Sequence, residues 1–140
     1  MTPADRATGV LFGLALGDAL GAPTEFMRFE EIRGRWGPDG PPEPRGTPAR
    51  VTDDTQMALA VGEALVAHAR TGAPLDAARL EPPLREAFVA WYRSPDNDRA
   101  PGGTCLMACQ RTPLPVPSRS GRHDSNVHEL DKTRRLWRLL

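Results

Sequence analysis

Two adjacent aspartates lie between threonines at positions 52 to 55, where a loop leads into an apolar, helix-forming segment. Carboxylate and hydroxyl oxygens are the ligands that hard divalent cations prefer, so Thr52, Asp53 and Asp54 could bind Mg²⁺, Mn²⁺ or Ca²⁺ rather than zinc. The same residue types suit the first turn of a helix, and Asp53 has the capping-box spacing to Gln56. A helix cap explains one aspartate, whereas the second favours a cation site.

Glycines recur every four residues upstream, at positions 9, 13, 17 and 21, along one stripe of an expected helix. A glycine inside a helix costs about 1 kcal/mol relative to alanine. The stripe therefore indicates close approach of another backbone or a ligand, with a tightly packed core helix as the alternative. Gly21 and Pro23 should end this helix. Glu25 follows in a loop, where a metal ligand or general base is often placed and where an ordinary surface glutamate is also common.

A third candidate segment, residues 99–106, combines a Pro-Gly-Gly turn with the start of a short apolar helix, for which Thr104 is the expected cap. Backbone N–H groups of Gly102 and Gly103 could bind a phosphate there. Pro-Gly-Gly is also a common turn without any ligand. Taken alone, this segment does not distinguish a phosphate-binding turn from an ordinary turn.

In this order, the three segments resemble the ADP-ribosylglycohydrolase family. The matching stretches are Gly-Asp-Ala-Leu-Gly-Ala-Pro-Thr-Glu-Phe at 17–26, Thr-Asp-Asp-Thr-Gln-Met at 52–57 and Ala-Pro-Gly-Gly-Thr at 100–104. The resemblance covers about the first 110 residues and implies an all-α fold. It also implies a pair of Mg²⁺ or Mn²⁺ ions and hydrolysis of the N- or O-glycosidic bond that joins ADP-ribose to a protein side chain or small molecule.

The resemblance also implies roles for individual residues. The metal ligands would be Thr52, Asp53, Asp54 and Glu25. Glu25, Asp53 and Asp54 would be the catalytic residues, with Glu25 as a ligand or acid–base residue near the metals. The segment with Gly102, Gly103 and Thr104 would lie against the ADP-ribose. The alternative within the family is a non-catalytic protein that binds ADP-ribose or is structural, as the jellyfish lens crystallin relatives are.

Full-length members of the family are longer and carry a second ligand motif, Asp-x-Asp-Thr after glycines, which this sequence lacks. We therefore expect a truncated N-terminal portion with incomplete ion sites, so that metal binding is weak or absent and hydrolytic activity is in question. Apolar helix faces left uncovered would favour self-association.

The last thirty residues differ in composition from the rest. Residues 1–110 hold 11 arginines and 15 acidic residues, whereas residues 111–140 hold 7 basic and 3 acidic residues. The proline and arginine bias after Gln110 is typical of a shifted reading frame in a GC-rich gene, which leads us to predict an atypical, frameshifted tail at 111–140 after a family domain at 1–110. The alternative is an ordinary basic linker followed by a helix from His128 to Leu140.

A rival function in the same region is a small Cys2His2-type zinc module. Cys105, Cys109, His123 and His128 fall within the loose spacing of such a site. Against it, both cysteines lie on an expected helix and the intervening segment lacks the aromatic core of a zinc finger. The alternative for the cysteines is a pair of buried, reduced thiols.

Composition bounds the remaining possibilities. The 140 residues amount to one domain, and a formal net charge of zero makes nucleic acid an unexpected partner. Two cysteines and no apolar signal segment predict a cytoplasmic protein, and Asp18 interrupts an apolar run that is already too short to span a membrane.

The expected elements follow a helical rhythm. The first helix covers residues 4–20. The second runs from about 54 to 69, and one of its faces carries Met57, Val61, Ala64, Leu65 and His68. His68 is expected to be partly buried or at a cleft edge rather than a ligand. A turn leads to Pro82-Pro83, after which Leu84, Phe88 and Trp91 form the buried face of a third helix. Residues 34–50, rich in glycine and proline, are predicted to form an ordered loop over the metal site.

Overall fold

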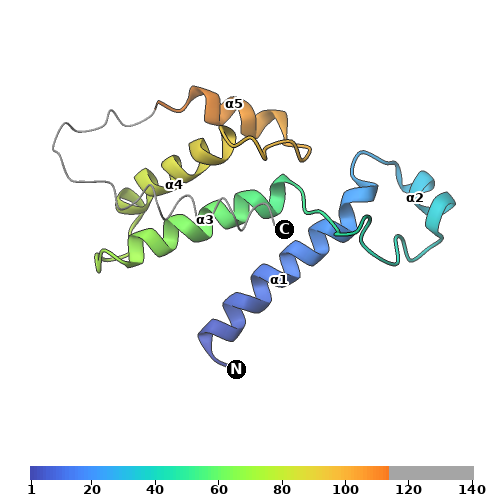
Figure 1. The fold of residues 1–140 in the computed structure, drawn as a ribbon, viewed down its shortest axis with the longest axis horizontal. Coiled ribbons are helices and arrows are strands. Elements are labelled where there is room, and N and C mark those ends of the chain that lie inside the picture. Colours follow the sequence, from blue (N-terminus) through green and yellow to red (C-terminus); the bar gives the residue numbers. More distant parts are fainter. Residues whose placement is uncertain (114–140) are drawn as a thin grey trace. The chain divides into compact units, whose positions relative to one another are not determined.

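The computed structural model describes residues 1–113, which form helices joined by turns and contain no β-strand within that range (Figure 1). The predicted all-α fold is confirmed. In order, the elements are α1 (Pro3–Gly21), the short 3₁₀ turn η1 (Ala22–Thr24), α2 (Phe29–Trp36), α3 (Asp53–Ala69), α4 (Ala77–Tyr92) and α5 (Gly103–Arg111). The chain divides into two compact units, residues 1–59 and the part from residue 60 onward, with the boundary inside α3.

Helix α1 begins with a reciprocal capping box. The Thr2 backbone N–H donates to Asp5 Oδ2 at 2.7 Å, and the Asp5 N–H donates to Thr2 Oγ1 at 3.1 Å. Pro3 at the first helical position needs no N–H partner there. The helix ends at Gly21, as the sequence predicts.

The glycine stripe of α1 faces open space within the described part of the chain. A Cβ atom built at Gly9, Gly13, Gly17 or Gly21 would have no non-helical neighbour within 4 Å among residues 1–113. The expected close approach of another backbone is therefore not seen there. Apolar side chains of α1 are also exposed, and self-association through them stays a prediction.

Helix α2 was not expected from the sequence. Its first turn is closed by Glu31, whose Oε2 accepts from the Arg28 N–H at 2.7 Å. Gly37 ends it with a φ of 85°, which a glycine adopts without strain. The predicted loop therefore begins after Trp36 rather than at Gly34.

Helix α4 starts five residues before the first of the two prolines that were expected to precede it. Asp76 caps the helix by accepting from the Arg79 N–H at 2.9 Å. Pro82 and Pro83 lie inside the helix, so the turn predicted there is wrong. Both prolines lack an N–H group, so two carbonyls one turn earlier lose their usual helical donors.

The core of the second unit forms around Trp91, which is fully buried, as predicted. Ala60, Ala64, Val89 and Cys109 are buried with it, and α4 packs against α5. His68 is 6% exposed, more buried than the partly buried position expected, and its Nε2 lies 3.1 Å from the carbonyl oxygen of Pro74. Leu65, predicted on the same face of the helix as Ala64 and His68, is 38% exposed, whereas those two residues are buried.

No single helix within residues 1–113 is long and apolar enough to cross a membrane. A bent pair, formed by the segment from α1 through η1 and by α2, meets the requirement by length and composition alone.

Cys105 and Cys109 are free thiols on α5, the first half-buried and the second buried. His123 and His128, the other half of the proposed zinc site, lie outside the described residues.

The two thiols should differ in reactivity. Burial, and secondarily the neighbouring Cys105, raises the pKa of the Cys109 thiol, so less of the reactive thiolate is present at a given pH. We expect iodoacetamide to alkylate Cys105 faster than Cys109 at pH 7.5, as measured by mass spectrometry of the digested chain. In guanidinium chloride the two rates should converge. Equal rates in the native chain would contradict the burial of Cys109.

Candidate functional site

The carboxylate of Asp18 joins α1 to the start of α3. Asp18 Oδ2 accepts from the backbone N–H groups of Thr52 at 2.8 Å and Thr55 at 3.2 Å, and from the Thr55 hydroxyl. Asp18 Oδ1 accepts from the Thr52 hydroxyl at 2.6 Å. Four donors from one short segment therefore converge on one side chain that lies 34 residues or more away in the sequence.

This contact changes how the start of α3 is capped. Asp53 is the first helical residue, not the residue before the helix, so its predicted role as the cap is wrong. Thr52 precedes the helix, and its Oγ1 lies 3.4 Å from the Asp54 N–H. The Thr55 N–H, which a local cap would bind, donates to Asp18 instead. Both aspartates then belong to the first turn, where carboxylates suit the positive end of the helix dipole.

We call the contact of Asp18 with Thr52 and Thr55, together with the neighbouring carboxylates, the junction. The predicted metal-binding residues lie at or near it. Thr52 and Asp53 are 9% and 7% exposed, whereas Asp54 and Glu25 are exposed. Within the described residues, the side chains of Asp54 and Glu25 have no hydrogen-bond or ion-pair partner. Both are nevertheless close enough to the neighbouring aspartates for their ionisation to be affected.

The carboxylates of this cluster titrate in opposite directions. Burial opposes ionisation of Asp18, but the hydrogen bonds from Thr52 and Thr55 outweigh it and hold the pKa of Asp18 below its ordinary value. Burial, followed by repulsion from Asp53 and Asp18, raises the pKa of Asp54. Burial, followed by repulsion from Asp53, Asp54 and Asp18, raises the pKa of Glu25. The negative charge at the junction is thus only partly compensated by the described protein groups.

The donor set fits a hard divalent cation as part of a coordination shell. Its oxygens come from carboxylates and a hydroxyl, which suit Mg²⁺ or Mn²⁺, and mutual repulsion of the carboxylates would be relieved by a bound cation. No group of three His, Cys, Asp or Glu residues within residues 1–113 is arranged to enclose an ion. Thr52, Asp53, Asp54 and Glu25 would therefore hold a metal together with water or further ligands.

The third predicted segment lies in the second unit, at the start of α5. Gly102, not Thr104, occupies the cap position, so the predicted cap was wrong, and Thr104 lies inside the helix. The preceding loop is held by Asn97, whose side-chain amide donates to the Tyr92 carbonyl at 3.3 Å. Ala100 has a φ of 57°, an unusual conformation for a residue with a side chain.

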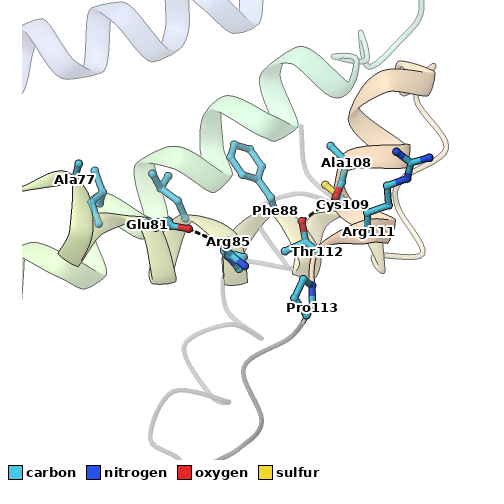
Figure 2. A pocket seen from close by; sticks show the side chains of 11 residues that line it. Ala77, Glu81, Arg85, Phe88, Ala108, Cys109, Arg111, Thr112 and Pro113 are labelled. Atoms are coloured by element: carbon cyan, nitrogen blue, oxygen red, sulfur yellow. Dashed lines mark hydrogen bonds and ion pairs between the residues drawn. The ribbon is translucent and has the colours of Figure 1, made fainter.

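A groove of about 630 Å³ between α4 and α5 does not coincide with any of these residues (Figure 2). Figure 2 shows Phe88 and Cys109 bordering it, with Thr112 at one end, where its hydroxyl donates to the Ala108 carbonyl at 2.8 Å. Its lining contains no cluster of carboxylates. The candidate site is therefore the junction at the start of α3 and not this groove.

Sequence reasoning assigned no role to Asp18. The available signal was that Asp18 is the one charged residue in the apolar, glycine-rich run at 7–24, within a stretch that carries the family resemblance. A buried or half-buried charge in such a helix requires a partner. The partner, Thr52 with Thr55, is not specified by any local spacing.

The all-helical fold agrees with the family to which the comparisons with known proteins assign the chain. The model of the family described as ADP-ribosylglycohydrolase matches residues 1–129, so the chain belongs to the ADP-ribosylglycohydrolase family. The match extends beyond Gln110, where the sequence predicted the family pattern to end.

Among curated relatives, the ADP-ribosyl-[dinitrogen reductase] glycohydrolase of Rhodospirillum rubrum is 40% identical over 111 residues, covering 76% of this chain and 34% of the relative. The ADP-ribosylarginine hydrolase Tri1 of Serratia proteamaculans is 36% identical over 102 residues, covering 73% of this chain and 25% of the relative. The chain thus spans about a third or less of the length of these relatives. No solved structure matches it significantly.

Backbone strain at Ala100 gives a stability prediction. Replacing Ala100 by glycine should raise the free energy of unfolding by up to about 1 kcal/mol, because the left-handed conformation disfavours a Cβ atom. The matched control is Ala7→Gly, at an exposed position inside α1. This substitution should lower the free energy of unfolding by about 1 kcal/mol. Urea unfolding followed by circular dichroism measures both. The same sign for both substitutions would contradict the left-handed geometry at residue 100.

Charge repulsion at the junction gives a second prediction. In the presence of a metal chelator at pH 7, Asp54→Asn should raise the free energy of unfolding. The gain should be less than about 1 kcal/mol because the carboxylate is exposed. The raised pKa of Asp54 means that its charged form is unfavourable in the folded state, so the gain should be present above that pKa and disappear as the carboxyl becomes protonated at lower pH. Thermal unfolding between pH 3 and pH 7 measures it. A gain independent of pH would argue against repulsion.

Proposed function

We propose that this protein takes part in hydrolysis of the glycosidic bond between ADP-ribose and a modified protein side chain or small molecule, with Mg²⁺ or Mn²⁺ as cofactor. The observation that carries the proposal is the placement of Thr52, Asp53 and Asp54 at the start of α3, with Glu25 close enough for both aspartates to affect its ionisation, in a chain of the ADP-ribosylglycohydrolase family. Oxygen donors with partly uncompensated charge are what a hard cation requires.

The residues divide the chemistry between them. Thr52, Asp53 and Asp54 would hold the metal, which supplies positive charge to stabilise the negative charge that develops in the reaction. Glu25 is exposed in the loop after η1, where its carboxylate can take a proton from water as the water oxygen bonds to the anomeric carbon. As that bond forms, the bond from the anomeric carbon to the modified group breaks, and the proton taken from water is returned by Glu25 or through solvent to the leaving group.

Gly102, Gly103 and Thr104 would contribute to ADP-ribose binding. Backbone N–H groups in the first turn of a helix point away from its body and attract phosphate. The N-terminus of α5 is exposed, and neither Gly102 nor Gly103 has a side chain that would obstruct a ligand there.

Arginine is the modified side chain that we propose as the substrate. The Serratia proteamaculans relative carries the name ADP-ribosylarginine hydrolase, and it is similar to this chain over 73% of the chain's residues. A second relative with the same name, from Pseudomonas putida, is 36% identical over 100 residues.

The test is release of ADP-ribose from an arginine-modified peptide, followed by chromatography. We expect release that requires Mn²⁺ or Mg²⁺ and stops in EDTA, at a rate well below that of the Rhodospirillum rubrum relative because the described ligands form only part of a shell. Asp54→Asn and Glu25→Gln should each abolish it. Glu30→Gln is the matched control, because Glu30 is also an exposed glutamate but lies on α2, and this variant should retain the release of ADP-ribose.

The outcomes separate the candidate functions. Binding of ADP-ribose without metal-dependent release would contradict hydrolysis and favour a non-catalytic ADP-ribose-binding protein. Release from serine-modified but not arginine-modified peptide would contradict the proposed substrate while keeping the reaction. Loss of activity in the Glu30→Gln control would indicate that unfolding, not chemistry, explains the other variants.

A further inference from the structure

The hydroxyl of Thr52 is oriented by Asp18. A threonine hydroxyl has one proton and two lone pairs. Its proton points to Asp18 Oδ1, at an oxygen–oxygen distance of 2.6 Å. The Thr52 oxygen can therefore act only as an acceptor toward its other neighbours. Among residues 1–113, the Asp54 N–H donates toward it at a long 3.4 Å. An oxygen so arranged has a lone pair available for a cation.

Asp18 also fixes the backbone on which the candidate ligands stand. It accepts from the Thr52 and Thr55 N–H groups, one on each side of Asp53 and Asp54. Rotation of this segment would break both bonds and the two hydroxyl contacts at once. The directions of the aspartate side chains therefore depend on a carboxylate that lies on another helix.

We propose that Asp18 is a positioning residue of the cation site, one that orients the Thr52 hydroxyl and the first turn of α3 without itself binding the metal. This inference rests on the proposed function, since it assumes that Thr52, Asp53 and Asp54 hold a divalent cation. A carboxylate is required, because the four contacts are all donors and an amide would turn an N–H₂ group toward some of them.

The alternative is that Asp18 only fastens α1 to the loop before α3. A fastening residue affects the fraction of folded chain, whereas a positioning residue changes the metal affinity of the chain that remains folded. The two roles are therefore distinguished by measuring stability and Mn²⁺ affinity separately on the same variants.

The experiment titrates the full chain with Mn²⁺ and follows binding by water-proton relaxation, at a temperature where circular dichroism shows each variant to be folded. Asp18→Asn should weaken Mn²⁺ binding at least tenfold, the scale on which residues that orient metal ligands act. Thr55→Val is the matched control, because it removes a hydrogen bond from the same carboxylate but leaves both Thr52 contacts. It should lower the unfolding temperature while changing Mn²⁺ affinity less than twofold.

Should Asp18→Asn fail to fold, Asp18→Glu takes its place, since it keeps the charge and moves the carboxylate by one methylene. Weakened binding in the Asp18 variant with retained binding in Thr55→Val supports positioning. Unchanged affinity in the Asp18 variant, or equal weakening in Thr55→Val, overturns it and leaves the proposed function intact. No Mn²⁺ binding by the unsubstituted chain overturns the metal site of the proposed function, and the positioning role with it.

Discussion

The first unit depends on the hydrogen bonds that the Asp18 carboxylate accepts from Thr52 and Thr55. Few apolar side chains in this unit are buried; Ala19 and Val51 are the buried hydrophobic residues within residues 1–59. Fully burying a valine contributes roughly 1.5–3 kcal/mol, about as much as one hydrogen bond to a charged group, and Asp18 accepts four such bonds. The polar junction therefore does more than the apolar contacts to determine how α1 meets the start of α3.

The same junction contains carboxylates in two different situations. Asp18 is surrounded by donors and is stabilised in its charged form, whereas Asp54 and Glu25 are exposed to repulsion from their neighbours. The charged forms of these two carboxylates are therefore disfavoured by their acidic neighbours. A bound cation, as in the proposed function, would relieve that repulsion.

Features that depend on local spacing were predicted correctly from the sequence. Features that depend on contacts between residues far apart in the sequence were not. The ends of α1 and α3 and the burial of Trp91 follow from glycine, periodicity and residue size. The start of α4 was missed because two internal prolines usually mark a turn, yet the Asp76 cap begins the helix before them. The expectation that Glu25, Asp53 and Asp54 lie near one another came from family resemblance. The contacts of Thr52 and Thr55 with Asp18, which hold this segment, span 34 residues or more and lie beyond any local pattern.

Helix α3 connects the candidate site to the rest of the chain. Its first turn carries Asp53 and Asp54, and its later turns carry Ala60, Ala64 and His68, which are buried in the second unit. The end of the helix is held by His68, whose Nε2 lies 3.1 Å from the Pro74 carbonyl oxygen. If Asp53 and Asp54 bind a cation, as proposed, the contacts of Thr52 and Thr55 with Asp18 hold the first turn of α3, and this is the rigidity that a partial coordination shell needs to keep its oxygens in place.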